Sequence, residues 1–149
     1  MNDYKFFMTR YINNEWEKET SLEDYFNGMK YCSCDGLSKK GKPKNIYTEN
    51  YAETEDLRIF IPEKVVRENT DLEFVFAFKG KKRRDIYDMF CDWITGYKIR
   101  YWDTCRMRQV EMVLLEATEP SDDYLYGSDP YIVATFKFKN LKGTAEIKQ

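Results

Sequence analysis

The chain has 149 residues, of which 42% are hydrophobic, 17% aromatic and 34% charged, and its formal net charge is −2. This length suits a single domain spanning 1–149, and because the charges nearly cancel, nothing in the composition indicates nucleic acid or an anionic membrane as a partner. The chain contains no histidine, which excludes His-based catalytic triads and every metal site that needs imidazole.

The first part of the chain predicts short strands around one helical turn. Residues 1–20 mix aromatic and charged side chains without a clean period, which fits either a first strand or an arm that docks on a neighbour. In Ser21–Gly28 the apolar side chains share one helical face before the terminal glycine, which predicts a short helical turn. Residues 30–48 predict a strand, a solvated and mobile lysine-rich loop at 35–44 and a second strand, and residues 57–61 predict another short strand.

The middle of the chain carries the two clearest periodic patterns. Leu72–Phe78 alternates with period two, which predicts a strand that turns one face to the core. In Asp85–Thr95 the period changes to that of a helix, and Gly96 follows as a typical C-terminal residue. We therefore expect one amphipathic helix over about 85–95. Its apolar stripe consists of Ile86, Met89, Phe90, Trp93 and Ile94.

Strands return after the helix. Residues 97–102 alternate, and a long strand is predicted from Cys105 to about Thr118. The apolar residues of this long strand fall on both faces, so either it is buried on both sides or a bulge lies near Gln109. After a loop, Tyr131–Lys139 predicts a strand, and a short final strand is expected near 144–148. In Tyr131–Lys139 the residues predicted to face the core are Ile132, Ala134, Phe136 and Phe138.

This order of elements predicts a mainly β fold of the α+β class. Several strands come first, one strong helix is inserted midway, and more strands follow. A sheet with one apolar face must cover that face. We therefore expect a β-sandwich or split β-barrel with the amphipathic helix packed on it.

Two loops of opposite charge are candidates for contacts with other proteins. The basic run that joins the phenylalanine-rich strand to the helix opposes the helix dipole. Binding of phosphate or of an acidic protein surface would explain it, although a solvated turn needs no such explanation. The acidic loop 119–129 lacks the spacing of a calcium loop. We expect both loops and the lysine-rich loop to lie near subunit contacts, with opposite charges pairing between neighbouring copies. The candidate interface residues are Lys79, Lys81, Lys82, Arg83, Arg84, Asp122 and Asp123.

The sequence carries no specific catalytic, cofactor or metal signature. Cys32 and Cys34 lie two apart on a predicted strand with both thiols on the same side, but no second close pair completes a zinc site, so buried or idle thiols are expected. No phosphate-binding glycine motif occurs. The apolar runs are shorter than the roughly 20 residues of a membrane helix, and the first residues lack the features of a signal peptide. We expect no enzyme, no cofactor, no specific nucleic acid, no membrane contact and no small-molecule substrate.

Four stretches together resemble a known family. They are NGMKYCSCDGLSKKGKPKNIYTENYAE, LRIFIP, LEFVFAFKGKKRRDIYDMFCDWITGYKIRYWDT and DPYIVATFKFKNLKG, which lie between Asn27 and Gly143. In order and texture they resemble small tail proteins of bacteriophages and prophages, especially the core domain of distal tail proteins and its tail-tube relatives.

This resemblance implies a β-sandwich or split barrel with one helix, assembled as a ring, usually a hexamer, around the tail channel. It implies other tail proteins as partners, and a location in the host cytoplasm during assembly and then in the virion tail. The alternative is a monomeric ligand-binding module for carbohydrate or peptide, with Trp102, Tyr124 and Tyr126 as contacts.

Overall fold

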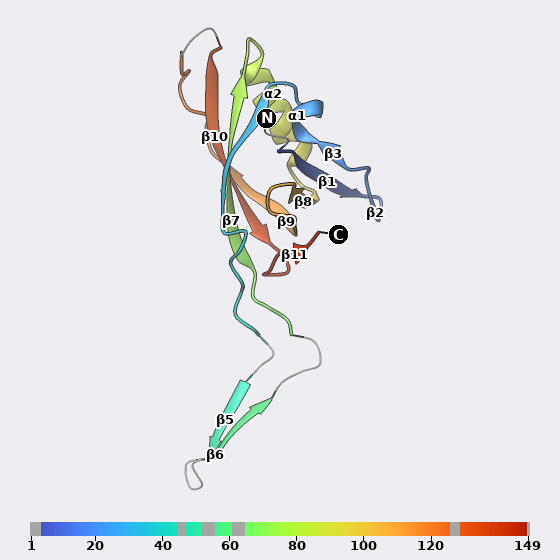
Figure 1. Ribbon diagram of the computed structural model, residues 1–149, viewed down its shortest axis with the longest axis vertical. Helices are drawn as coiled ribbons and strands as arrows, with labels where there is room; N and C mark the ends of the chain where they lie inside the picture. Colours follow the sequence, from blue (N-terminus) through green and yellow to red (C-terminus); the bar gives the residue numbers. More distant parts are fainter. Residues whose placement is uncertain (1–3, 45–46, 52–55, 61–64, 126–128, 149) are drawn as a thin grey trace.

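The computed structural model describes residues 4–44, 47–51, 56–60, 65–125 and 129–148, and these form one large sheet, a separate hairpin and two helices (Figure 1). In chain order the elements are β1 (Phe6–Ile12), β2 (Glu15–Trp16), β3 (Thr20–Ser21), α1 (Leu22–Tyr25), β4 (Met29–Asp35), β5 (Tyr47–Tyr51), β6 (Asp56–Phe60), β7 (Thr70–Lys79), α2 (Arg83–Ile94), β8 (Lys98–Asp103), β9 (Arg108–Ala117), β10 (Tyr131–Asn140) and β11 (Glu146–Ile147).

The large sheet is antiparallel, with the order β2-β1-β8-β9-β10-β7-β4. Short strands extend it at two places, where β3 pairs with β1 and β11 pairs with β9. The longest ladder joins β7 to β10 without interruption, from Lys79 opposite Tyr131 to Thr70 opposite Asn140. These two ten-residue strands therefore form the centre of the molecule. Residues 6–12, within the segment that the sequence left open as strand or arm, form a strand of this sheet.

The sheet folds back on itself, so that strands far apart in the ladder order meet across the core. The ring of Phe6 on β1 stacks on Phe76 of β7 with centroids 5.7 Å apart, although three strands separate β1 from β7 in the sheet. Phe74 of β7 likewise meets Tyr101 of β8 edge to face at 4.7 Å. The predicted mainly β fold, a sandwich-like sheet with a helix packed on it, is confirmed.

The alternating patterns place the core residues where the sequence predicted them. Along β10 the four predicted core residues are all buried, with exposed fractions of 2% or less. On β7, Leu72, Phe74, Phe76 and Phe78 are buried in the same way, because side chains two apart on a strand share a face.

Two β-bulges interrupt the ladders. Of the two alternatives for the long strand, the bulge near Gln109 is wrong in its position, since Gln109 pairs regularly with Trp102. The extra residue in β9 is Leu115, which is 57% exposed. In β4 the extra residue is Cys32, so Cys34 packs on the core whereas Cys32 is exposed. The two thiols therefore do not lie on the same side, because the bulge shifts the alternation by one residue.

Helix α2 covers the core beside β7 and β10. It runs from Arg83 to Ile94, two residues earlier than predicted at its start, and Gly96 follows with φ +87°, a left-handed conformation that favours glycine. Phe90 is fully buried and its ring contacts Phe26, Phe76 and Phe136 at 5.2–5.6 Å between centroids. The predicted apolar stripe is thus mostly correct, but its member Met89 is 59% exposed.

The hairpin of β5 and β6 stands away from the body of the molecule (Figure 1). The two strands pair with each other, and neither joins the large sheet. The two chain segments that carry the hairpin are bonded at its base: the Lys44 N–H donates to the Val66 carbonyl, and the Glu68 N–H donates to the Lys42 carbonyl, both at 2.8 Å. The hairpin is thereby attached close to Thr70, where β7 begins.

We expect Phe90→Ala to lower the free energy of unfolding by about 3–5 kcal/mol, because it opens a cavity among three aromatic rings. Met89→Ala removes an exposed side chain from the adjacent helical position and serves as the matched control, with an expected change below about 0.5 kcal/mol. Urea unfolding followed by tryptophan fluorescence measures both. Equal losses in the two variants would contradict the position of Phe90 in the core.

Candidate assembly surface

The basic turn, residues 79–84, joins the end of β7 to the start of α2. The Lys79 N–H donates to the Gly28 carbonyl at 2.8 Å, and the Gly80 N–H donates to the Pro130 carbonyl at 3.1 Å. Gly80 has φ +94°, which a residue with a Cβ adopts only with strain. The turn is therefore held between the segment before β4 and the segment before β10.

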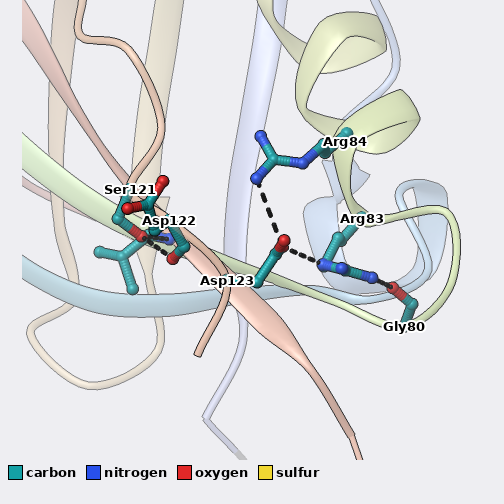
Figure 2. A network of polar contacts seen from close by, with 7 residues as sticks. Gly80, Arg83, Arg84, Ser121, Asp122 and Asp123 are labelled. Atoms are coloured by element: carbon teal, nitrogen blue, oxygen red, sulfur yellow. Dashed lines mark hydrogen bonds and ion pairs between the residues drawn. The ribbon is translucent and has the colours of Figure 1, made fainter. Parts of the chain in front are cut away.

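The two arginines of the basic turn bind the acidic loop of the same chain (Figure 2). The Arg83 Nε donates to Asp123 Oδ1 at 2.7 Å, and Arg83 Nη1 donates to the Gly80 carbonyl at 3.0 Å. The Arg84 Nη2 lies 3.3 Å from the same Asp123 oxygen. Figure 2 shows the Asp123 carboxylate pointing at both guanidinium groups, whereas the Asp122 side chain lies apart from them.

This geometry changes the expected pairing between neighbouring copies. Arg83, Arg84 and Asp123 form their ion pairs within the chain, because the loop before β10 passes beside the start of α2. Cations at a helix N-terminus are unfavourable because they oppose the helix dipole. The Asp123 carboxylate beside the first turn of α2 offsets this cost. These three residues are therefore already engaged before any partner arrives.

The other candidate residues remain open to solvent. Lys79, Lys81, Lys82 and Asp122 are all exposed. The ion pairs found in the described part of the chain involve none of the four. Three cations that form no ion pair with the described residues thus gather on a turn whose backbone is fixed.

These lysines border a cavity, which we call the basic groove. It has a volume of about 580 Å³ and lies between α1 and α2. Besides the three lysines, Tyr25, Phe26, Ile86 and Met89 line it with apolar surface, and Asp129 contributes one carboxylate. Tyr25 and Met89 are each 59% exposed, so the groove presents large apolar side chains to solvent together with three lysines.

The acidic loop is fixed to the edge of β10. The Ser121 N–H donates to the Val133 carbonyl at 2.9 Å, and the Tyr124 N–H donates to the Tyr131 carbonyl at 2.8 Å. The Tyr124 ring stacks on Tyr131 with centroids 5.1 Å apart and is 49% exposed. Tyr126, named as a ligand contact of the alternative function, lies outside the described residues.

Trp102, another predicted ligand contact, is covered by its own chain. Its ring stacks on Phe7 with centroids 4.5 Å apart, and the Lys148 ammonium lies 4.9 Å from the ring centroid. The indole Nε1 donates to Glu19 Oε1 at 3.2 Å. Trp102 therefore does not offer an open stacking face for a sugar.

The lysine-rich loop 35–44, expected to be solvated and mobile, is anchored to the rest of the protein at two points. Leu37 is 3% exposed and belongs to the core. The Gly41 N–H donates to the Gly143 carbonyl at 2.7 Å, and Arg67 Nη1 donates to the Gly41 carbonyl at 2.9 Å. Lys39 and Lys40 between these anchors are exposed.

The cysteines show no reactive or metal-binding arrangement. Burial raises the pKa of Cys32, Cys91 and Cys34, the last to about 11, so these thiols are protonated at neutral pH. Among the residues that the structure describes, no group of three or more Cys, Asp or Glu side chains is placed to hold a metal ion. No helix in the same residues is long and apolar enough to cross a membrane.

Sequence reasoning missed the apolar half of the groove. It predicted strands near those of the hairpin, but not that β5 and β6 pair with each other apart from the large sheet. Tyr25 and Met89 are 64 positions apart in the sequence, and only the packing of α1 beside α2 brings them to one cavity. For the hairpin a signal was present: residues 47–60 hold Tyr and Phe at both ends and a cluster of acids in the middle. That pattern is typical of two short strands joined by a polar turn.

The ion pair between Arg83 and Asp123 gives a pH dependence. The hydrogen bond from Arg83 lowers the pKa of Asp123 below its usual value of about 4. A lowered pKa in the folded state means that the pair stabilises the fold above that usual value, and that this stabilisation disappears as the pH falls through the lowered pKa.

We therefore expect Asp123→Asn to destabilise the fold at neutral pH and to lose this effect in acid. Urea unfolding over a series of pH values measures it. Asp122→Asn is the matched control, because it changes the neighbouring carboxylate, which has no ion pair in the described part of the chain. A constant difference between wild type and Asp123→Asn at every pH would contradict the assignment.

Comparison with known proteins finds similar structures but no similar sequence family. A scan of protein-family models and a search of curated proteins both find no match. Among solved structures the chain is similar to a chain of the phage p2 baseplate in its activated conformation, in one structure with Sr and in another with Ca. Both comparisons give a TM-score of 0.57 at 11% identity.

The similar region covers 95% and 94% of this chain, respectively, and 45% of the baseplate chain in both cases. This chain thus spans less than half the length of the chain it matches. At this identity the likeness shows the fold, and the resemblance to phage tail proteins is confirmed at that level.

Proposed function

We propose that this chain is a structural subunit of a phage or prophage tail, of the distal tail or tube-like kind, and that it acts by assembling with copies of itself into a ring. In this proposal it is made in the host cytoplasm, joins other tail proteins, and ends in the virion tail. The likeness of its fold to a phage baseplate chain supports the proposal over 95% of the chain.

The observation that carries the self-assembly is the separate β5–β6 hairpin. Its strands are five residues each, and they form no ladder with the large sheet. A two-stranded hairpin alone is at best marginally stable in water, because it buries too little surface on either face. Such a hairpin needs a surface to pack on, and in a homomeric ring the neighbouring subunit supplies that surface.

The proposed action is packing without chemical turnover. The whole chain lacks histidine, which removes the commonest general base. The surface that the structure offers instead consists of exposed lysines, exposed apolar side chains and a projecting hairpin. These features are typical of a protein that recognises other proteins.

Light scattering after size exclusion, over a concentration series and with negative-stain images of any large species, tests the proposal. We expect a discrete ring whose fraction grows with concentration, because each added copy completes a further contact. A clean monomer at every concentration would contradict self-assembly. A monomer that binds a carbohydrate or peptide saturably would favour the ligand-binding alternative.

A variant without the hairpin gives a sharper test. Replacing residues 45–65 by Asn-Gly joins Lys44 to Val66 through a two-residue turn, which suits the hydrogen bond that already links them. We expect this variant to keep the wild-type circular dichroism spectrum and to remain monomeric. A variant that forms the same rings as wild type would show that the hairpin has no part in assembly.

A further inference from the structure

We propose that the basic groove is the docking site for the β5–β6 hairpin of a second copy of this chain. This inference rests on the proposed self-assembly and names the two surfaces that meet in it.

The groove has the chemistry of an acceptor for an acidic segment with apolar side chains. Tyr25 and Met89 are more than half exposed on its walls, an unfavourable state for large apolar side chains that a partner would relieve. Lys79, Lys81 and Lys82 line it as well, against the single acid Asp129. The groove therefore combines apolar walls with a net positive charge.

The arginines next to the groove do not compete for this role. Arg83 and Arg84 already bind Asp123, which draws their guanidinium groups towards the acidic loop. The three lysines have no ion pair in the described residues, so their charge is available to an external carboxylate. A lysine ammonium is a compact charge on a flexible stem, so it can approach a carboxylate from many directions.

The hairpin has the complementary chemistry. Between Tyr47 and Phe60 the sequence contains Glu49, Glu53, Glu55 and Asp56 but only one basic residue, Arg58. The same segment contains five large apolar residues, namely Tyr47, Tyr51, Leu57, Ile59 and Phe60. An acidic segment rich in aromatic and branched apolar residues fits a groove with apolar walls and three lysines.

The hairpin and the groove of one molecule lie at opposite ends of it. Figure 1 shows the hairpin beyond the start of β7 and both helices at the other end of the same strand. A ten-residue strand is about 33 Å long, and the hairpin of this chain extends from the Thr70 end of β7 away from the groove beside Lys79. Its occupant therefore comes from a second copy. A contact between different surfaces of identical subunits is heterologous, which is the kind that closes into rings.

The test uses two full-length charge variants. The groove variant carries Lys81→Glu and Lys82→Glu, and the hairpin variant carries Glu49→Lys and Asp56→Lys. Each alone places like charges across the proposed contact, and we expect its self-association to be weakened by roughly tenfold or more at low salt. Mixing the two variants restores opposite charges at every contact, so the mixture should assemble nearly as well as wild type.

Sedimentation velocity at low and high salt measures all samples, and circular dichroism verifies that each variant is folded. Lys5→Glu with Lys18→Glu is the matched control: it makes the same charge change at two exposed lysines outside the groove and should assemble as wild type.

The outcomes separate this inference from the proposed function. If wild type forms rings and either charge variant assembles equally well, the hairpin–groove contact is overturned and the proposed ring remains. The same holds if wild type forms rings but the mixture of variants does not regain assembly. Wild-type protein that is monomeric throughout would overturn self-assembly itself, and this inference with it.

Discussion

The aromatic side chains that β7 sends into the core hold the two halves of the sheet together, and the rest of the structure depends on this contact. Phe74 and Phe76 stack with centroids 5.7 Å apart, and across the core they meet Tyr101 of β8 and Phe6 of β1. An apolar sheet face is stable only when it is covered. The sheet therefore curves until its own strands cover it, and α2 closes the remaining side with Phe90.

Parts of this fold could be predicted from the sequence because their periods were long and unbroken. The alternation in Leu72–Phe78 continues over seven residues, and the stripe in Asp85–Thr95 spans three helical turns, so each pattern determines one buried face. The positions of the bulges could not be predicted in this way. The apolar residues of β9 fall on both faces, which is compatible with a bulge but does not identify Leu115 as the extra residue, and the short strand β4 gives no such signal at Cys32. The groove was out of reach for another reason: its walls come from segments that only tertiary packing brings together.

The charged segments also show what the sequence alone could not predict. The sequence shows a basic run and an acidic loop, but it does not show whether the two meet within one molecule or between two. The structure divides the basic run by residue type. Its arginines donate hydrogen bonds to a carbonyl and a carboxylate of the same chain, whereas its lysines stay in water. The planar guanidinium group suits fixed hydrogen-bond geometry, and the ammonium group suits solvent-exposed charge.

The uninterrupted ladder of β7 has a mechanical consequence. The hairpin is attached near the first residue of this strand and lies beyond that end of it (Figure 1). A pull on the hairpin is therefore directed along β7, whose hydrogen bonds to β10 on one side and β4 on the other lie across the direction of force. Under such shear the bonds carry the load together instead of opening one by one like a zipper. The strand whose side chains organise the core is thus also placed to resist a pulling force on the hairpin.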